Sequence, residues 1–478
     1  MNKSMIRYLL SKLLLIEAVL LLVPVAIAVY YRESSQVFTA LFSTIGILVL
    51  LGGSGSLQKP KNQRIYAKEG VLIVALCWSL WSFFGGLPFV FSGQIPSLID
   101  AFFEISSGFT TTGASILNDV SVLSRSLLFW RSFTHLIGGM GVLVFALAIM
   151  DNAKNSHLEV MKAEVPGPVF GKVVSKLKNT AQILYLLYLA LFSLFVIIYY
   201  LAGMPLYDSF VIAMGTAGTG GFTVYNDGIA HYGSSLITYL VSIGVLVFGV
   251  NFNLYYLMLR RIKAFFGDEE LRAYLVIVLV STGLISLNTL YLYPGVSKSF
   301  EMTFFQVSNI ITTTGFGYGD ITNWPLFSQF ILLFLMAIGG SAGSTAGGLK
   351  IIRGLILSKI AKNQILSILS PHRVLTLHVN QTVIDKDTQH KILKYFVIYA
   401  MILLALIFIV SLDSNDFLVV TSAVFSCFNN IGPILGTTSS FSIFSPISKI
   451  LLSFAMIAGR LEIYPILLLF MKRTWSKR

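Results

Sequence analysis

Long apolar runs, separated by short polar segments, follow one another along nearly the whole chain. Hydrophobic residues make up 55% of its 478 residues and charged residues only 12%. Many of the runs approach the ~20 residues that a helix needs to cross a bilayer, so the pattern predicts an all-α polytopic membrane protein. No small-residue cleavage site follows the first run, which indicates a retained span and not a signal peptide.

Four polar clusters interrupt this apolar pattern at similar intervals. They read TTTGA, TGGF, TTTGF and NNIGP, and their central glycines are Gly113, Gly221, Gly315 and Gly432. The segment before each cluster has only ~10–15 residues, too few to span, and suits a re-entrant helix enclosed by protein. A small-residue loop that recurs four times can surround one axis with backbone carbonyl groups. The clusters therefore predict a cation-selective pore within one polypeptide.

The repeats divide the chain into four predicted units around one central pore. Each unit consists of an outer helix, a re-entrant pore helix, a filter loop and a second helix. Two extra N-terminal transmembrane helices precede the units. The predicted boundaries are 1–58 for these two helices and 68–150, 181–263, 270–362 and 390–471 for the pore repeats, the third with its second helix interrupted by a loop at 339–350.

The predicted filter consists of the residues beside each central glycine. Glycine reaches backbone angles that other residues avoid, so a carbonyl group there can turn towards the axis. The alternative is a glycine that only permits close helix packing, which suits the glycines within 52–55 and 138–141. The candidate ion-binding residues are Thr111, Thr112, Gly113, Thr219, Gly220, Gly221, Thr313, Thr314, Gly315, Asn430, Ile431 and Gly432.

A further glycine-rich run lies within the second helix of the third unit. That helix would extend from Trp324 to Lys362, ~39 residues or ~58 Å, nearly twice the thickness of the hydrocarbon. Its middle, residues 339–350, is too rich in glycine to hold a stable helix. Non-helical backbone at membrane depth is tolerated where it lines a cavity, and a tight helix-packing surface is the alternative. A phosphate-binding loop is excluded, because Lys350 does not directly follow a glycine and no Ser or Thr follows it.

One arginine, Arg460, falls within the second span of the fourth unit. An ionisable residue inside a membrane helix is by default a functional residue that faces the interior or water. Glu462 is two positions away and does not share its helix face, so it is a poor direct partner. Arg460 is therefore predicted to reach the carbonyl groups of the glycine-rich run or the pore water, with a purely structural role as the alternative.

The basic residues behind the net charge of +13 are distributed along the chain as expected for one orientation in the membrane. With the N-terminus in the cytoplasm, 27 of the 34 Lys and Arg residues fall in cytoplasmic segments and five in outward segments. This positive-inside bias predicts cytoplasmic N- and C-termini and argues against a nucleic-acid partner. The outward segments are net acidic, which would concentrate cations unless the acids cap helices or pair with Arg125 and Arg131. These acids are Glu33, Asp100, Glu104, Asp119, Asp208, Asp227, Glu301, Asp320, Asp413 and Asp416.

Catalytic and metal-binding patterns are not found in the sequence. Cys77 and Cys427 lie in different apolar segments, which excludes a disulfide framework or a CxxC metal site. His135 lies within a span, as either a satisfied buried histidine or part of a proton relay. The sequence therefore predicts a protein that is not an enzyme and that holds no covalent cofactor.

The polar clusters are similar to those of one transport family. They read SSGFTTTGAS (106–115), GTAGTGGFTVYN (215–226), NIITTTGFGYGD (309–320) and FNNIGPILG (428–436). In these strings the chain resembles the TrkH/KtrB/HKT superfamily of potassium uptake proteins, and most of all its bacterial TrkH branch. A serine in place of one central glycine goes with sodium transport in related plant transporters. Because all four glycines are present, the resemblance implies that the filter binds potassium.

The resemblance also implies that residues 339–350 form a gate beneath the filter. The gate residues would be Gly339, Gly340, Gly343, Gly347, Gly348, Lys350 and Arg460. A peripheral cytosolic nucleotide-binding regulatory subunit like TrkA, a homodimer and a place in the bacterial inner membrane are further implied.

The sequence thus predicts the potassium-selective ion-conducting subunit of a bacterial potassium uptake system. The alternative is a proton- or sodium-coupled potassium symporter of the same fold. The titratable candidates for such coupling within the membrane are Glu17, His135, Lys350, Arg460 and Glu462, too few for a convincing relay.

The charge asymmetry generates a test of orientation. Single cysteines at Asn62 and Asn155 should be protected from impermeant thiol reagents added outside intact cells, whereas one at Asn118 should be labelled. The unmodified chain, with Cys77 and Cys427, supplies the background signal. The reverse labelling pattern would show that the predicted orientation is wrong.

Overall fold

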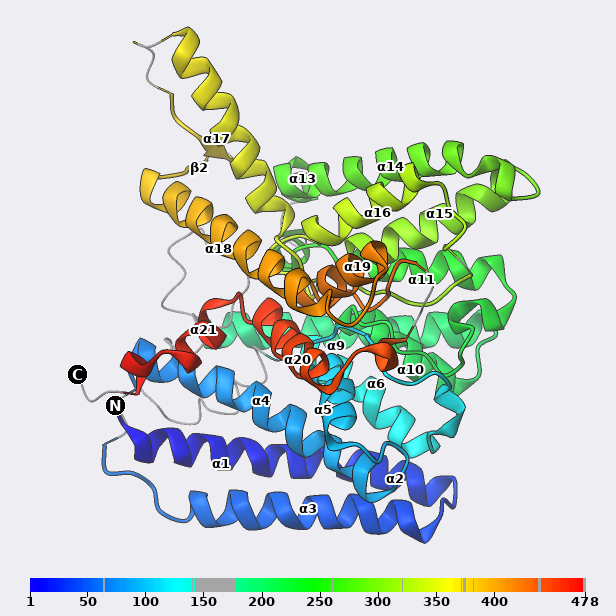
Figure 1. Ribbon diagram of the computed structural model, residues 1–478, viewed down its shortest axis with the longest axis vertical. Coiled ribbons are helices and arrows are strands. Elements are labelled where there is room, and N and C mark those ends of the chain that lie inside the picture. Colours follow the sequence, from blue (N-terminus) through cyan, green and yellow to red (C-terminus); the bar gives the residue numbers. More distant parts are fainter. Residues whose placement is uncertain are drawn as a thin grey trace.

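The structure is a computed structural model of the chain. It describes residues 1–478 except 63–64, 140, 142–176, 259–261, 320, 371, 373–374, 381, 437–439 and 476–478. The end of the first predicted unit near residue 150, the basic stretch that contains Asn155, and Asp320 lie outside the described residues. The described chain is mostly helical, as expected, with many helices parallel to one another and both termini on the same side, at the left of Figure 1.

Among the residues that the structure describes, six helices are long and apolar enough to cross a membrane. Two lie near the N-terminus, where α1 (Lys3–Leu20) continues into α2 (Leu22–Tyr30) and α3 (Ser35–Ser56) runs back beside them. The other four are the outer helices α4 (Ala67–Phe91), α9 (Leu177–Leu201), α14 (Glu269–Asn288) and α18 (Lys386–Val410). The chain is thus a multi-pass membrane protein, as its apolar pattern predicts.

A shorter helix follows each outer helix. These four pore helices are α5 (Leu98–Phe109), α10 (Leu206–Gly218), α15 (Val296–Ile311) and α19 (Phe417–Phe428). With 12 to 16 residues each, they are too short to span a bilayer. Each ends at one of the polar clusters, which is the arrangement that the short amphiphilic segments predicted.

An inner helix returns after each cluster, and those of units two, three and four are also short. The inner helices are α6 (Arg125–Gly139), α11 (Ser235–Phe248), α16 (Leu326–Ile338) and α20 (Pro446–Arg460). The expectation of one continuous second helix in units two and four is wrong. After α11 the chain bends by 90° into α12 (Phe252–Met258), and after α20 it breaks before α21 (Tyr464–Phe470). In unit three, α16 and α17 (Ile351–Leu369) flank the glycine-rich run, which is not helical.

The remaining elements are short. They are α13 (Ile262–Gly267), the 3-10 turns η1 (Val120–Val122), η2 (Gly228–Tyr232), η3 (Leu290–Leu292), η4 (Phe441–Ile443) and η5 (Lys472–Thr474), and a hairpin of β1 (His378–Val379) and β2 (Thr382–Val383).

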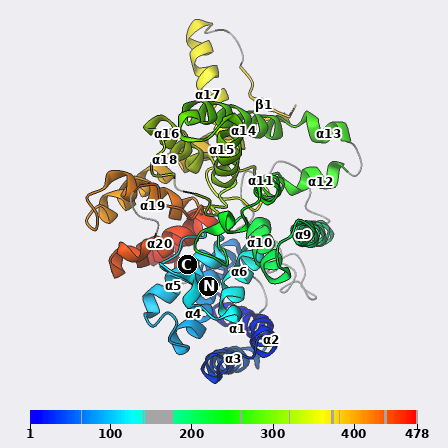
Figure 2. The same ribbon diagram turned by 90° about the vertical axis from the view of Figure 1, so that its right-hand side faces the viewer.

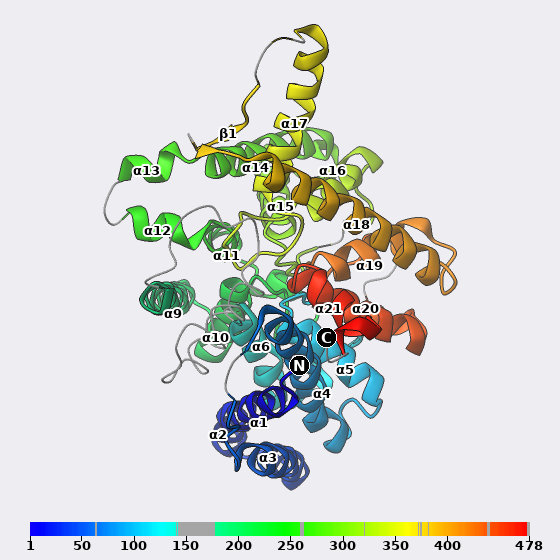
Figure 3. The ribbon, with the colours of Figure 1, turned by 90° about the vertical axis from the view of Figure 1, so that its left-hand side faces the viewer.

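Seen along the helices, the four groups surround one centre in chain order. Figure 2 shows α5 and α6, then α10 and α11, then α15 and α16, then α19 and α20 around a region of loops, and Figure 3 shows the same order from the opposite side. The exact domain boundaries stay predictions. A single buried apolar cluster joins the N-terminal helices to units one and four, while units two and three have clusters of their own. The N-terminal helices therefore support the first unit from outside.

Candidate functional site: four loops around one axis and the segment they contact

All four pore helices end in the same backbone turn, although the clusters differ in sequence. The second residue before each central glycine is in the left-handed conformation, with φ between 55° and 58°. Its N–H donates to the carbonyl three residues back, and the next N–H donates to the carbonyl five residues back, at 2.8–2.9 Å. These two bonds are those of a Schellman motif. The left-handed residues are Thr111, Thr219, Thr313 and Asn430.

A left-handed threonine is unusual, since glycine normally fills this position at a helix end. The conformation costs a β-branched residue roughly 1–3 kcal/mol, so surrounding contacts must hold it. Thr313 is held through its hydroxyl, which accepts a hydrogen bond from the N–H of Gly347 at 2.6 Å. Asn430 is held through its amide, which donates to Thr112 Oγ1 at 3.0 Å and to the carbonyl of Met456 at 2.8 Å. The first and fourth clusters are thereby joined directly.

The central glycines close the four clusters into a ring. A Cβ atom on Gly113 would lie 2.6 Å from the nitrogen of Gly221, and one on Gly221 would overlap the carbonyl of Gly315. A Cβ on Gly315 would overlap the carbonyl of Ile431, and one on Gly432 would lie 2.7 Å from the carbonyl of Thr112. Each glycine thus faces the next cluster in chain order. All twelve predicted ion-binding residues belong to these four contiguous turns, and a side chain at any of the four glycines would disrupt the ring.

A buried ion pair stands behind the first filter loop. Glu104 on α5 accepts from Arg131 Nε at 2.6 Å, from the N–H of Ile116 at 2.9 Å and from Ser115 Oγ at 2.9 Å. Both charged side chains are almost fully buried. The guanidinium of Arg131 also lies 3.4 Å from the centre of the Phe222 ring in the second cluster. This pair therefore fixes the chain just after Gly113 and packs against the loop that follows it.

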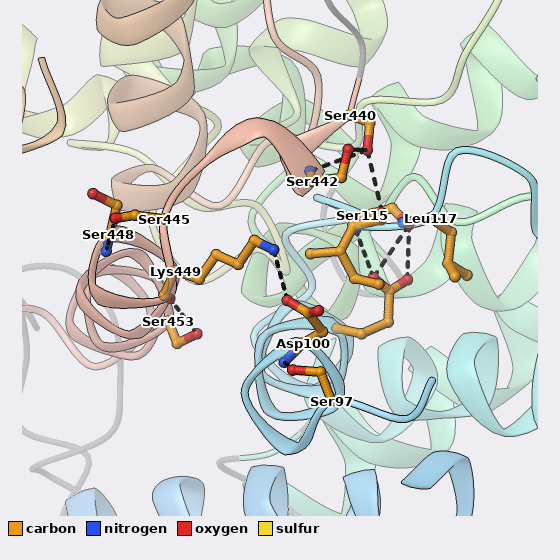
Figure 4. Close-up of polar contacts among 12 residues, drawn as sticks. Ser97, Asp100, Ser115, Leu117, Ser440, Ser442, Ser445, Ser448, Lys449 and Ser453 are labelled. Atoms are coloured by element: carbon orange, nitrogen blue, oxygen red, sulfur yellow. Dashed lines mark hydrogen bonds and ion pairs between the residues drawn. The ribbon is translucent and has the colours of Figure 1, made fainter. Parts of the chain in front are cut away.

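The interpretation of the outward acids as a free acidic mouth is wrong for several of them. Besides Glu104, Asp100 accepts from Lys449 at 2.7 Å, an ion pair that joins α5 to α20 (Figure 4). Glu301 pairs with Lys298 at 2.7 Å. Glu301 also accepts from Ser235 Oγ at the start of α11 at 2.8 Å, so all three carboxylates hold neighbouring elements together. The alternative, in which the acids cap helices or pair with Arg125 and Arg131, is confirmed for Glu104, whereas Asp100 and Glu301 pair with lysines instead.

His135 on α6 lies between the first and second filter loops. Its Nδ1 is 2.8 Å from the carbonyl of Gly108, and its ring stacks on Phe222 with centroids 4.3 Å apart. The ring also leaves no room for a side chain at Gly220. Its Nε2 is buried without a partner. His135 thus packs between the first two clusters with one ring nitrogen hydrogen-bonded, and its contacts with the described residues form no relay.

The segment 339–350 is buried and lies in direct contact with the filter clusters. Besides the bond from Gly347 to Thr313, a Cβ on Gly347 would overlap the carbonyl of Asn429 in the fourth cluster. Ser341 N–H donates to the carbonyl of Gly249 at 3.1 Å, and the carbonyl of Gly343 accepts from Phe252 at 3.0 Å. These contacts reach the point where α11 bends into α12. The seven predicted gate residues are thus brought to one place. It lies where the helices of units two, three and four are interrupted.

Arg460 joins this segment to the first unit. Its Nη1 donates to the carbonyl of Thr345 at 2.6 Å, and its Nη2 donates to the carbonyls of Gly138 at 2.6 Å and Gly139 at 3.1 Å. The prediction that Arg460 reaches loop carbonyls is met in the structure. Lys350 donates in the same way to the carbonyl of Ala346, while Glu462 pairs with Arg353 on α17. The buried, positively charged side chains of Arg460 and Lys350 thus donate hydrogen bonds directly to backbone oxygens of the segment.

Sequence reasoning missed several residues of this site. Thr345 accepts from Arg460, Gly249 marks the bend of unit two, and Glu270 on α14 accepts from two backbone N–H groups of the segment and its following helix. The glycine at 249 was visible, but a single glycine in a membrane helix is as often a packing position. Glu270 lies at the start of a span. An acidic residue there is ordinarily explained by its favourable interaction with the helix dipole.

Comparison with known proteins places this geometry in a family. The model of the TrkH family, described as cation transport protein, matches residues 34–477. The chain belongs to the TrkH family. Its relatives include the Trk system potassium uptake protein TrkG of Escherichia coli, 32% identical over 95% of each chain, and TrkH of Salmonella typhimurium, 32% identical over 96% of each chain. Membership of this family indicates a cation transport protein.

The fold agrees with a solved member of the family. The crystal structure of the potassium transporter TrkH from Vibrio parahaemolyticus superposes with a TM-score of 0.90, 29% sequence identity and full coverage of both chains. The arrangement of the four loops around one axis is therefore that of an established cation transporter fold.

The ion pair behind the first loop can be tested by stability. Arg131→Met should lower the free energy of unfolding by about 3–5 kcal/mol, because it leaves the Glu104 carboxylate buried without its counter-charge. Thermal unfolding in detergent micelles measures the change. The matched control is Lys391→Met, since Lys391 and its partner Asp387 are 75% and 80% exposed and their pair contributes little. Equal melting temperatures for Arg131→Met and the parent would contradict a charged pair at this site.

Proposed function

We propose that this chain is the potassium-conducting subunit of a bacterial potassium uptake system. The observation that supports the proposal most is the closed ring of four identical helix-end turns, each with a glycine against the next cluster. Carbonyl oxygens on such turns can replace the hydration shell of a monovalent cation. The relatives named as potassium uptake proteins support potassium as the ion. The twelve residues of the four turns would bind it as substrate in passage.

The segment 339–350, with Arg460, is the proposed gate. It is non-helical backbone at membrane depth, it contacts two filter clusters, and Arg460 adds a positive charge beside it. A cation that leaves the ring would meet this segment and this charge. For the pore to open, the segment's hydrogen bonds to Thr313 and Arg460 would have to break or shift together. The segment and Arg460 would therefore act as a single barrier.

The surroundings of the pore are proposed from the family and the charge pattern. The basic segments near both termini support an orientation with both termini in the cytoplasm and a place in the inner membrane of a bacterium. The relatives are named as proteins of a Trk system, and we propose that a separate cytosolic regulatory subunit that binds nucleotide, like TrkA, acts with this chain. We further propose a homodimer in which each chain keeps its own pore.

Reconstituted flux tests the conducting role and the filter together. In liposomes under single-cation gradients the parent should pass potassium in strong preference to sodium, and Gly113→Ser should reduce that preference by about tenfold, ~1.4 kcal/mol. The added side chain would press on Gly221, at a position where φ is 79°. Gly283→Ser is the control, because the structure leaves open space at Gly283 on α14. Equal permeability ratios for Gly113→Ser and the parent, at normal protein levels, would remove Gly113 from the filter. Potassium flux that requires a proton or sodium gradient would favour the symporter.

Basal flux tests the gate. Removal of residues 339–348 and, separately, Arg460→Ala should each raise potassium flux without the regulatory partner, because each weakens the same barrier. Their combined effect should be less than additive, as for groups that act as a unit. Lys472→Ala, an exposed basic residue near the C-terminus, is the control. A deletion variant that folds and conducts no better than the parent would make the segment a packing surface. Lower flux and lower stability in Arg460→Ala would show that the arginine has a structural role and is not part of the gate.

A further inference from the structure

One carboxylate joins the two ends of the glycine-rich segment. Glu270, the second residue of α14, is 5% exposed, and its Oε1 accepts from the N–H of Ala342 at 2.7 Å and from the N–H of Ile352 at 3.1 Å. Ala342 lies where the segment begins and Ile352 lies in the first turn of α17, just after it ends. The same oxygen therefore closes the stretch 342–352 into a loop.

The two N–H groups depend on this carboxylate. The first N–H groups of a helix have no partner within the helix, so Ile352 needs an outside acceptor. Ala342 is in irregular backbone, which inside a membrane protein must be satisfied by the protein itself. An anionic acceptor at the start of α17 is also favoured by the helix dipole, and charge-assisted bonds are stronger than neutral ones. Loss of the carboxylate would leave both ends of the segment without this acceptor.

The residues just before Glu270 hold the β-hairpin. Asn380, in the turn between β1 and β2, donates from its side chain to Asp268 at 2.6 Å and from its N–H to Glu269 at 3.1 Å. Its side-chain oxygen accepts from the N–H of Glu269 at 2.8 Å. Lys359 on α17 bonds both the Glu269 carboxylate and the carbonyl of His378 at the start of the hairpin. The first turn of α14 is therefore clamped between the hairpin and α17.

Apolar contacts reach the same two ends of the segment. Leu377 and Val379 of the hairpin region are buried in one cluster with Ile352 and Ile356 of α17, and Ala342 packs against this cluster. The hairpin thus shares one apolar cluster with Ile352, and Ala342 packs against that cluster. A displacement of the hairpin would act on the segment through the apolar cluster and through the first turn of α14 at once.

We propose that Glu270 is the positioning residue that latches the 339–350 segment in place, and that the hairpin at 377–384 controls this latch through Asp268 and Glu269. The proposal rests on the gate proposed above, because it concerns what holds that gate shut. Glu270 touches no ion in this role. It acts by keeping both ends of the segment against α14.

Hydrogen exchange measured by mass spectrometry tests the latch directly. In the full-length protein in micelles, Glu270→Ala should make the amides of 339–352 exchange about tenfold faster, since two charge-assisted bonds are lost. Glu270→Gln, which keeps one acceptor oxygen and the side-chain volume, should give an intermediate rate and guards against a misfolded alanine variant. The control is Asp387→Ala, an exposed acid on α18 that pairs only at the surface. Unchanged exchange in both Glu270 variants would overturn the proposal.

The proposed control of the Glu270 latch by the hairpin is tested with a separate variant. Asn380→Gly removes the side chain at a residue whose φ is 48°, a conformation that glycine accepts, and should also speed exchange of 339–352. With Glu270→Ala already present it should add little. If Asn380→Gly leaves the segment's exchange unchanged, the hairpin's control of the latch is refuted. Potassium flux separates the latch from the gate: faster exchange with unchanged basal flux supports the latch and contradicts the gate, whereas faster exchange with raised flux supports both.

Discussion

Backbone that leaves a helix inside a membrane must find its hydrogen-bond partners within the protein. This chain does so at the ends of four pore helices, and it uses the same Schellman turn each time. The turn needs a left-handed residue, here threonine or asparagine, and the side chains of Thr313 and Asn430 are held by their neighbours. The four glycines then let the turns meet. Everything else around the site supports this arrangement of irregular backbone.

Buried charge is the second means of support. Glu104 and Arg131 neutralise each other behind the first loop, while Arg460 and Lys350 give their hydrogen bonds to backbone carbonyls. A buried charge is costly unless it is paired and hydrogen-bonded, so each of these groups ties down the element that satisfies it. Arg460 illustrates the result, because one guanidinium joins the glycine-rich segment to the end of α6. Three units are fixed relative to one another by such contacts.

The same physics explains why the glycine-rich segment is suited to movement. It is rich in glycine, and it is held by separate hydrogen bonds to Thr313, Gly249, Arg460 and Glu270. Segments held by polar contacts and rich in glycine lie at the low end of local stability, where moving elements are found. A packed helix at this place could not shift without a cavity. The break in the helix thus separates the segment proposed as the gate from the ring of four turns.

The sequence alone determined the membrane class, the four clusters and the break at 339–350. Apolar length and runs of glycine act locally, so a linear pattern is enough to reveal them. The tertiary structure decided the bends after Gly249 and Arg460, because one glycine or one arginine in a helix is equally compatible with straight packing. It also decided the partners of Glu104, Arg460 and Glu270, which lie 11 to 322 positions away along the chain. Such pairs form only when the helices have packed, since nothing in a linear pattern says which buried charge will meet which backbone group.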